Sequence, residues 1–282
     1  MTKVISYIVE RESRRPIQAD IHYPETGGKA IPLIIFLHGF KGFKDWGHWP
    51  LVAEFLARSG FVVIRFNFSH NGTTRENPMA FGDLDAFAKN TFSKELEDVE
   101  AVLDDIVWRA GKEINCDPAR VGLLGHSRGG GIAFLAAFRD KRVRAVAAWA
   151  GISDLEPRVN PPELDEWKKN GVIYTINSRT GESLPINYSL REDFYANKKR
   201  LDIPYAVKHL NIPILLVSGT KDESVPFAEA EKMSTWNMLA RFEAIAGAGH
   251  TFGGKHPWTE KDLPADTVKA LQPTIAFFRE NL

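Results

Sequence analysis

A serine lies between two glycines at the junction of two apolar segments of the chain. Gly125-His126-Ser127-Arg128-Gly129 follows the apolar run Val121–Leu124 and precedes the Ala- and Phe-rich segment Ile132–Phe138. This order predicts a strand, a sharp turn and a helix, with the serine hydroxyl raised above the end of a sheet. Because glycine has no Cβ, the two glycines let the helix backbone pass close to the strand. A Gly-rich turn without chemistry is the alternative interpretation of the pentapeptide alone.

Apolar runs alternate with helical patterns along most of the 282 residues. Val4–Val9 and Ile17–His22 are predicted to form an antiparallel hairpin. A continuous apolar run, which is typical of a strand buried on both faces of a parallel sheet, covers Pro32–Leu37. Further strands are predicted at Phe61–Phe66, Val143–Trp149 and Pro213–Ser218, with a weaker strand at Phe242–Ile245. We therefore expect a single α/β domain over residues 1–282, with a mostly parallel, twisted sheet of about eight strands and helices on both faces.

Amphipathic helices are predicted between and after these strands. One covers Trp49–Ser59, and a second begins with Ser93 as its N-cap and ends before Gly111. The closing helix has apolar residues at helical spacing from Val268 to Phe278. Pro273 lies inside this helix, so we expect it either to kink the helix or to begin its second half.

The alternation breaks down at about residues 153–210, where prolines and glycines punctuate a segment rich in aromatic residues. Long insertions in compact domains are usually functional, so we expect a cap or lid over the serine. A surface insertion whose aromatic side chains only bury one another is the alternative. If the cap lines a pocket for an apolar or aryl group, the candidate residues are Trp167, Tyr174, Tyr188, Phe194 and Tyr195.

The composition argues against several classes of function. Lys plus Arg and Asp plus Glu both number 36, so the basic excess of a nucleic-acid-binding protein is missing. Cys116 is the single cysteine, which excludes an intrachain disulfide, and neither a zinc motif nor a phosphate-binding loop is present in the sequence. We expect no cofactor or metal, no nucleic-acid or membrane partner, and a cytoplasmic location unless a signal peptide has been removed. The oligomeric state is not indicated.

A serine hydroxyl needs a base to take its proton and a carboxylate to orient that base. Asp222 directly follows the predicted strand Pro213–Ser218, and His250 lies in a Gly-rich loop after the last strand. Ligands bind beyond the carboxyl ends of parallel strands, so both side chains are predicted to reach Ser127. Asp154, which follows Val143–Trp149, is a second candidate for the carboxylate.

Acyl transfer also needs donors for the oxyanion of the tetrahedral intermediate. The backbone N–H of Arg128, next to the nucleophile, is one predicted donor. The second is the N–H of Phe40, in the His38-Gly39-Phe40 turn that follows Pro32–Leu37. For His38 itself a structural, hydrogen-bonded role is expected.

Ser127, Asp222, His250 and the His38-Gly39-Phe40 turn together resemble the α/β-hydrolase superfamily over most of the chain. Three further features are similar to dienelactone-hydrolase-like and cinnamoyl or feruloyl esterase-like members. They are Asp117-Pro118 before the strand that leads to Ser127, the Gly-Thr-Lys-Asp turn at Asp222, and the middle insertion. Dienelactone hydrolases proper carry cysteine at the nucleophile position, whereas this chain has serine. The resemblance implies a cofactor-free serine hydrolase.

The expected reaction is serine-dependent hydrolysis of carboxylic esters through an acyl-enzyme, and the resemblance implies short acyl or hydroxycinnamoyl esters as substrates. Three alternatives are open. The same triad serves thioesterases and acyltransferases, it serves serine peptidases, and a protein that keeps the fold can instead bind a small ligand without turnover. The sequence neither decides among these functions nor identifies the natural ester.

Overall fold

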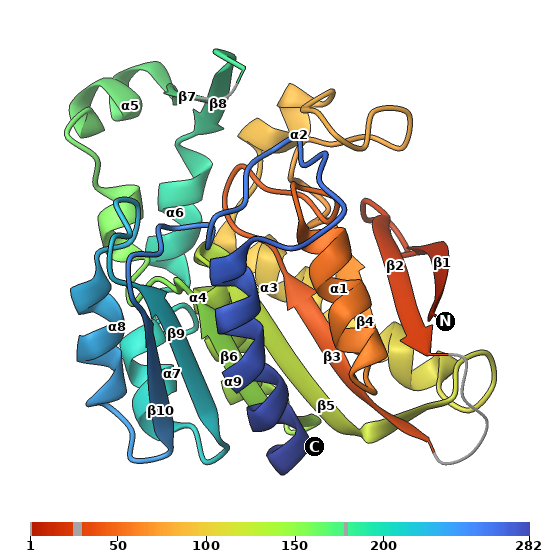
Figure 1. Ribbon diagram of the computed structural model, residues 1–282. Coiled ribbons are helices and arrows are strands. Elements are labelled where there is room, and N and C mark those ends of the chain that lie inside the picture. The colour runs from red at the N-terminus through yellow and green to blue at the C-terminus, as the bar shows by residue number, and fades with distance from the viewer. Residues whose placement is uncertain (1, 25–29, 178–179) are drawn as a thin grey trace.

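A computed structural model describes residues 2–24, 30–177 and 180–282. Its described residues form an eight-stranded sheet in the order β1-β2-β4-β3-β5-β6-β9-β10, and β7 and β8 pair separately (Figure 1). The β1–β2 and β2–β4 pairs are antiparallel. The remaining neighbours in this sheet, from β4 through β3, β5, β6 and β9 to β10, are parallel. The strands of the main sheet are β1 (Thr2–Val9), β2 (Ile17–Pro24), β3 (Ile31–Leu37), β4 (Val62–Phe66), β5 (Cys116–His126), β6 (Val143–Trp149), β9 (Ile214–Gly219) and β10 (Ala240–Ile245).

The central strands are apolar because helices cover both faces of the sheet. Every residue of β4 and β9 is buried, as is the whole run Leu33–Leu37 of β3. In β1, at the sheet edge, the residues are mostly exposed or half-buried. The predicted α/β fold class and the mostly parallel sheet are therefore confirmed.

Two layers of helices enclose the sheet (Figure 1). Helices α1 (Trp49–Arg58) and α9 (Ala265–Asn281) contribute side chains to the apolar core on one face. The core on the other face includes side chains of α3 (Phe92–Arg109), α4 (Arg128–Arg139), α7 (Ile203–His209) and α8 (Phe227–Ser234). Helices α1, α3, α4 and α9 are predicted from the sequence, whereas α7 and α8 are not.

Two local predictions about helices need correction. The N-cap of α3 is Thr91 and not Ser93, because Thr91 has the extended backbone of a cap and its hydroxyl accepts the N–H of Lys94. Of the two alternatives for Pro273, the start of a second half is wrong, because α9 runs without interruption from Ala265 to Asn281. The carbonyl that a residue at position 273 would normally bond belongs to Lys269, an exposed residue, so water can satisfy it.

The insertion after β6 contains a 3-10 turn at Glu156–Val159, helix α5 (Leu164–Asn170), the hairpin of β7 (Val172–Ile176) and β8 (Ser183–Asn187), and helix α6 (Ser189–Ala196). In Figure 1, α5, β7 and β8 lie above one end of the main sheet. Helix α7, which the predicted boundary at residue 210 included, packs on α4 as part of the helical layer. The cap is thus shorter at its C-terminal end than the sequence suggested.

None of the helices in the described ranges is both long and apolar enough to cross a membrane.

Four buried histidines make the stability of the fold dependent on pH. Burial lowers the pKa of His22, His38 and His48 to about 4 and that of His126 to about 3. The unfolded chain therefore binds protons below about pH 6.5 that the folded chain does not bind, and stability is lost as the pH falls from there.

We expect the urea midpoint to fall steeply between pH 7 and pH 5, with about 1–2 kcal/mol lost for each of these groups. His48→Gln, which removes one of the four, should flatten the dependence by about one proton. Equal midpoints at pH 7 and pH 5 would contradict this assignment of neutral histidines.

Candidate active site

A cavity of about 380 Å³ opens where the parallel strands end. Its lining comes from the loops that follow five different strands: Gly39 and Phe40 after β3, Ser127 after β5, Ile152 after β6, Ser224 after β9 and His250 after β10. This is the edge of an open α/β sheet at which ligands bind. The cavity therefore collects residues that are far apart in the sequence.

Ser127 occupies a strained turn between β5 and α4. Its backbone angles, φ 55° and ψ −122°, lie in a region that residues with a Cβ rarely adopt. The turn is held in place because the N–H of Ser127 donates to the carbonyl of Trp149 at 2.9 Å. Although Ser127 stands at the N-cap position of α4, its hydroxyl does not cap the helix. The hydroxyl is therefore not bonded to the helix backbone, and Ser127 lines the cavity.

The two flanking glycines are required by close backbone contacts. A Cβ on Gly125 would lie 2.2 Å from the carbonyl oxygen of Gly129, and a Cβ on Gly129 would lie 2.3 Å from that of Leu37. Both distances are far below van der Waals contact, and the opposing atoms are backbone atoms that no rotamer change can move. The steric reason inferred from the sequence for these glycines is therefore correct.

Gly129→Ala should destabilise the protein by about 3 kcal/mol or more, because α4 must move away from the end of β3 to admit the methyl group. Gly131→Ala is the matched control in the same helix, since its Cβ would meet the side-chain ends of Ile203 and Ile152 instead of backbone. Thermal unfolding of the two variants measures the difference. A Gly129→Ala variant with the melting temperature of Gly131→Ala would show that the backbone contact is not limiting.

Asp222 and His250 are joined by a hydrogen bond. His250 Nδ1 lies 2.8 Å from Asp222 Oδ2, while Asp222 Oδ1 accepts the backbone N–H groups of Ser224 and Val225, each at 2.9 Å. Burial alone would raise the pKa of Asp222, but the bonds from His250 and these N–H groups outweigh burial and lower it. Asp222 is therefore an ionised acceptor that fixes the orientation of the His250 ring.

The rival carboxylate, Asp154, is used elsewhere. Its Oδ1 accepts the backbone N–H of Glu156 at 2.9 Å, a local turn contact, and Asp154 is not part of the cavity lining. The structure pairs His250 with Asp222, the carboxylate that the sequence analysis ranked first.

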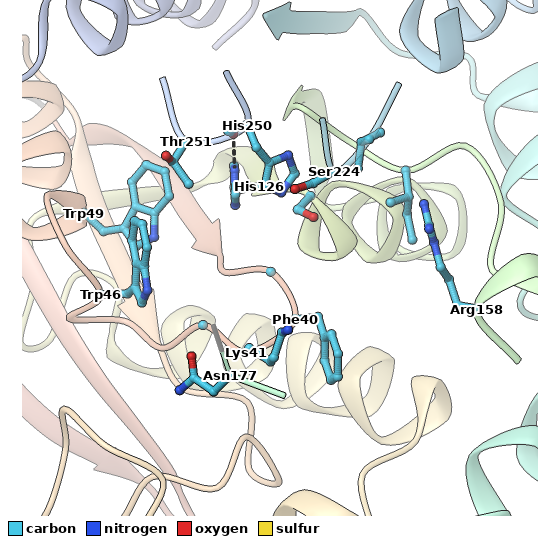
Figure 2. Close-up of a pocket in the computed structure, with 15 residues that line it drawn as sticks. Phe40, Lys41, Trp46, Trp49, His126, Arg158, Asn177, Ser224, His250 and Thr251 are labelled. Atoms are coloured by element: carbon cyan, nitrogen blue, oxygen red, sulfur yellow. Dashed lines mark hydrogen bonds between the residues drawn. The ribbon is translucent and has the colours of Figure 1, made fainter. Parts of the chain in front are cut away.

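His126, the residue before the serine, contacts His250 through its imidazole ring. Its Nε2 lies 2.9 Å from the backbone oxygen of His250, and the two imidazole rings are 4.8 Å apart (Figure 2). Burial lowers the pKa of His126 to about 3, so the ring is neutral and its Nε2–H donates this bond. Sequence reasoning did not assign His126 a role, although its place inside the pentapeptide was the available signal.

The two predicted oxyanion donors come from the loop after β3 and from the start of α4. Phe40 lines the cavity, and Arg128 is the first residue of α4, where helical N–H groups have no partner within the helix. Among the hydrogen bonds of the described residues, none uses the backbone N–H of Phe40 or that of Arg128. The positive end of the α4 dipole adds to the attraction that both N–H groups offer an anion.

His38 has the structural role expected from the sequence. Its Nε2 accepts the N–H of Phe68 at 3.2 Å, so the ring proton is on Nδ1, which lies 2.9 Å from the carbonyl oxygen of Gly39. The imidazole thus ties the end of β3 to the end of β4.

The five aromatic residues of the insertion are absent from the lining of this cavity. Trp167 and Phe194 are buried inside the cap, with Trp167 edge-on to Tyr188, whereas Tyr174 is 63% exposed. The Tyr195 hydroxyl lies 3.1 Å from Glu156 Oε1. The expectation that these side chains line the substrate pocket is therefore corrected: Trp167 and Phe194 are buried within the insertion, and Tyr174 and Tyr195 are exposed.

Other aromatic and polar side chains take their place. Trp46 and Trp49 form one wall of the cavity, Arg158 lies across from them, and Lys41 and Asn177 lie along the lower edge of the cavity in this view (Figure 2). The cap contributes Asn177 and the 3-10 turn contributes Arg158. Sequence analysis used Trp49 only as the start of a helix, because helical spacing does not reveal which helix end faces a cavity.

A solved structure shares this fold over nearly its whole length. Est1E from Butyrivibrio proteoclasticus, solved with ferulic acid bound, superposes with a TM-score of 0.72, and the match covers 98% of both chains at 18% sequence identity. Identity this low supports the fold and not the substrate.

Curated relatives are similar at the level of sequence. The Bacillus subtilis protein named Putative esterase YitV is 26% identical over 208 residues, which are 74% of this chain and 75% of YitV. The human mitochondrial palmitoyl-protein thioesterase ABHD10 is 26% identical over 217 residues, 76% of this chain and 64% of that protein. In Escherichia coli relatives with 28–29% identity, the match spans only 54% of their length.

A family model described as the alpha/beta hydrolase family matches residues 34–260. This range includes the β3 turn, the elbow serine, the Asp222 turn and the His250 loop. The chain therefore belongs to the alpha/beta hydrolase family.

Proposed function

We propose that the protein is a serine-dependent carboxylic ester hydrolase. The observation that carries this proposal is the 2.8 Å bond between His250 Nδ1 and Asp222 Oδ2, in a cavity that His250 shares with Ser127 on its strained turn. With Nδ1 bonded to a carboxylate, the His250 ring presents Nε2 as the base.

In the proposed reaction, Ser127 Oγ attacks the acyl carbon of the ester while His250 Nε2 takes the hydroxyl proton. The carbonyl oxygen becomes an oxyanion, which the N–H groups of Phe40 and Arg128 stabilise. Collapse of this intermediate breaks the ester bond, and His250 returns the proton to the leaving alkoxide. A water molecule, activated by the same imidazole, then hydrolyses the acyl-enzyme and regenerates Ser127.

The substrate class proposed is a short acyl or aryl ester, including hydroxycinnamoyl esters. A cavity of about 380 Å³ is in the range of small-molecule sites, and the indole rings of Trp46 and Trp49 offer flat apolar surface to an aryl group. Est1E, which binds ferulic acid in its solved structure, has the same fold.

Covalent labelling tests the proposal. A fluorophosphonate phosphonylates a serine only where that serine is activated, so intact-mass spectrometry of the wild type should find one adduct per chain. The adduct should be lost in Ser127→Ala and in His250→Ala. An unlabelled wild-type protein would refute the proposed function and favour a ligand-binding protein that keeps the fold without turnover.

A thioesterase is the second candidate, and the similarity to a palmitoyl-protein thioesterase favours it. The same residues would act on a thioester, with a thiolate in place of the alkoxide as leaving group. Comparing kcat/KM for p-nitrophenyl esters and for acyl-CoA of matched acyl length separates the two candidates.

A further inference from the structure

The side chain of Arg128 lies outside the cavity that Ser127 and His250 line. Its guanidinium lies 4.4 Å from the centroid of the Phe40 ring and 5.8 Å from that of Phe92. Arg128 and Phe40 are the two residues whose N–H groups are the proposed oxyanion donors. One side chain therefore links the two donors, although Phe40 lies in the loop after β3 and Arg128 begins α4.

Glu95 anchors this link to α3. Its Oε1 lies 2.6 Å from Arg128 Nη2 and accepts the side-chain N–H of Asn90 at 2.7 Å. The exposed fractions of the two side chains are 14% for Arg128 and 2% for Glu95, so the pair is largely excluded from water. A buried ion pair has a high desolvation penalty and is weak evidence for stability alone, which makes a positional role worth testing.

The Phe40 ring is also held from elsewhere. Phe87 of α2 (Leu84–Ala88) lies 5.7 Å from it, centroid to centroid. Further along the same loop, Lys44 forms a 2.5 Å ion pair with Asp20 of β2, and both side chains are buried. With these supports fixed, the contact with Arg128 decides where the Phe40 end of the loop lies relative to α4.

We infer that Glu95 and Arg128 form a positioning unit, in which the guanidinium holds the Phe40 ring and so sets the separation of the two oxyanion N–H donors. This inference rests on the proposed function. Neither side chain touches the reacting atoms, so both are positioning residues and not catalytic ones. A guanidinium suits this task because it pairs with a carboxylate in its plane and stacks on an aromatic ring with its face.

The consequence is a defect confined to the transition state. An ester in its ground state needs little from the oxyanion donors, so KM should stay nearly constant when the donors are misplaced. Removing one oxyanion donor lowers kcat by about 10²- to 10³-fold in a well-studied hydrolase, so misplacing one should lower kcat by about 10- to 100-fold. A trifluoromethyl ketone forms a hemiketal with Ser127, and this adduct carries the oxyanion. The affinity for this inhibitor should therefore fall by the same factor.

Two variants remove the contact from opposite sides. Arg128→Met keeps the length and apolar stem of the side chain but removes the charge, and Phe40→Leu removes the ring but keeps the N–H. Each should lower kcat and trifluoromethyl ketone affinity in parallel, with KM within about twofold. Because both break one contact, the double variant should lose little more than the worse single variant. Arg142→Met is the control, since Arg142 pairs with Asp140 beyond the far end of α4.

The outcomes separate this inference from the proposed function. If the wild type is not labelled by a fluorophosphonate, the proposed function fails and the inference fails with it. If the wild type is active and both variants keep its kcat and inhibitor affinity, only the positioning role is wrong. Where Arg128→Met proves too unstable, Phe40→Leu decides alone, because it leaves no buried charge unpaired. A purely structural pair would instead lower the melting temperature while kcat per folded molecule stays at the wild-type value.

Discussion

Ser127→Ala should lower kcat by about 10⁶-fold and leave the fold intact. Without Oγ no acyl-enzyme can form, and the only route left is direct attack of water on a bound ester. A residual rate above the uncatalysed reaction should survive, because the substitution leaves the cavity and the proposed oxyanion donors, the N–H groups of Phe40 and Arg128, in place. Steady-state hydrolysis of a p-nitrophenyl ester measures the loss.

The backbone explains why the variant should fold. The strained φ of 55° at position 127 is imposed by the N–H bond to the Trp149 carbonyl and by the glycine contacts, none of which involves Oγ. Ser224→Ala is the matched control, since it removes another serine hydroxyl from the same cavity. It should keep its fluorophosphonate adduct and lose less than about tenfold in kcat. Turnover of Ser127→Ala close to that of the wild type would contradict the assignment of the nucleophile.

The elbow and the sheet could be predicted because their determinants are local. The buried strands appear in the sequence as runs of mainly apolar residues, and Gly125 and Gly129 mark a turn that a Cβ would block. Chain order then places Asp222 and His250 after parallel strands, at one edge of the sheet. Tertiary proximity followed from topology without any knowledge of side-chain packing.

The lining of the cavity could not be predicted in this way. Aromatic residues in the insertion look the same in a sequence whether they face the serine or one another, and Trp167 and Phe194 are buried within the cap. Trp46 and Trp49 instead reach the cavity because the loop after β3 folds back over the sheet edge. That path depends on long-range contacts, including the buried pair of Lys44 with Asp20, which no local pattern encodes.

The ion pair between Glu95 and Arg128 could not be predicted from the sequence either. In the sequence, Glu95 stands near the start of the predicted helix, a position where acidic residues are favourable for a local reason. Its pairing with Arg128 requires α3 and α4 to pack side by side on one face of the sheet. A helical wheel shows on which face of its helix a residue lies, but not which residue of a neighbouring helix it contacts.

Asp222→Asn should lower kcat by about 10⁴-fold while Ser127 and His250 keep their positions. Asp222 Oδ1 accepts two backbone N–H groups, so the amide oxygen of the asparagine must take that place and its NH₂ group must face His250. The NH₂ group is a donor only, and it therefore requires His250 Nδ1 to be the acceptor. The ring proton then moves to Nε2, which points at the serine as an N–H and can no longer act as the base.

The variant thus tests the tautomer and not merely the presence of a carboxylate. Asp154→Asn is the matched control, because it makes the same chemical change in the carboxylate that the structure does not pair with His250, and its kcat should stay within about twofold of the wild type. Equal losses in the two variants would mean that a general loss of negative charge, and not the orientation of His250, limits the rate.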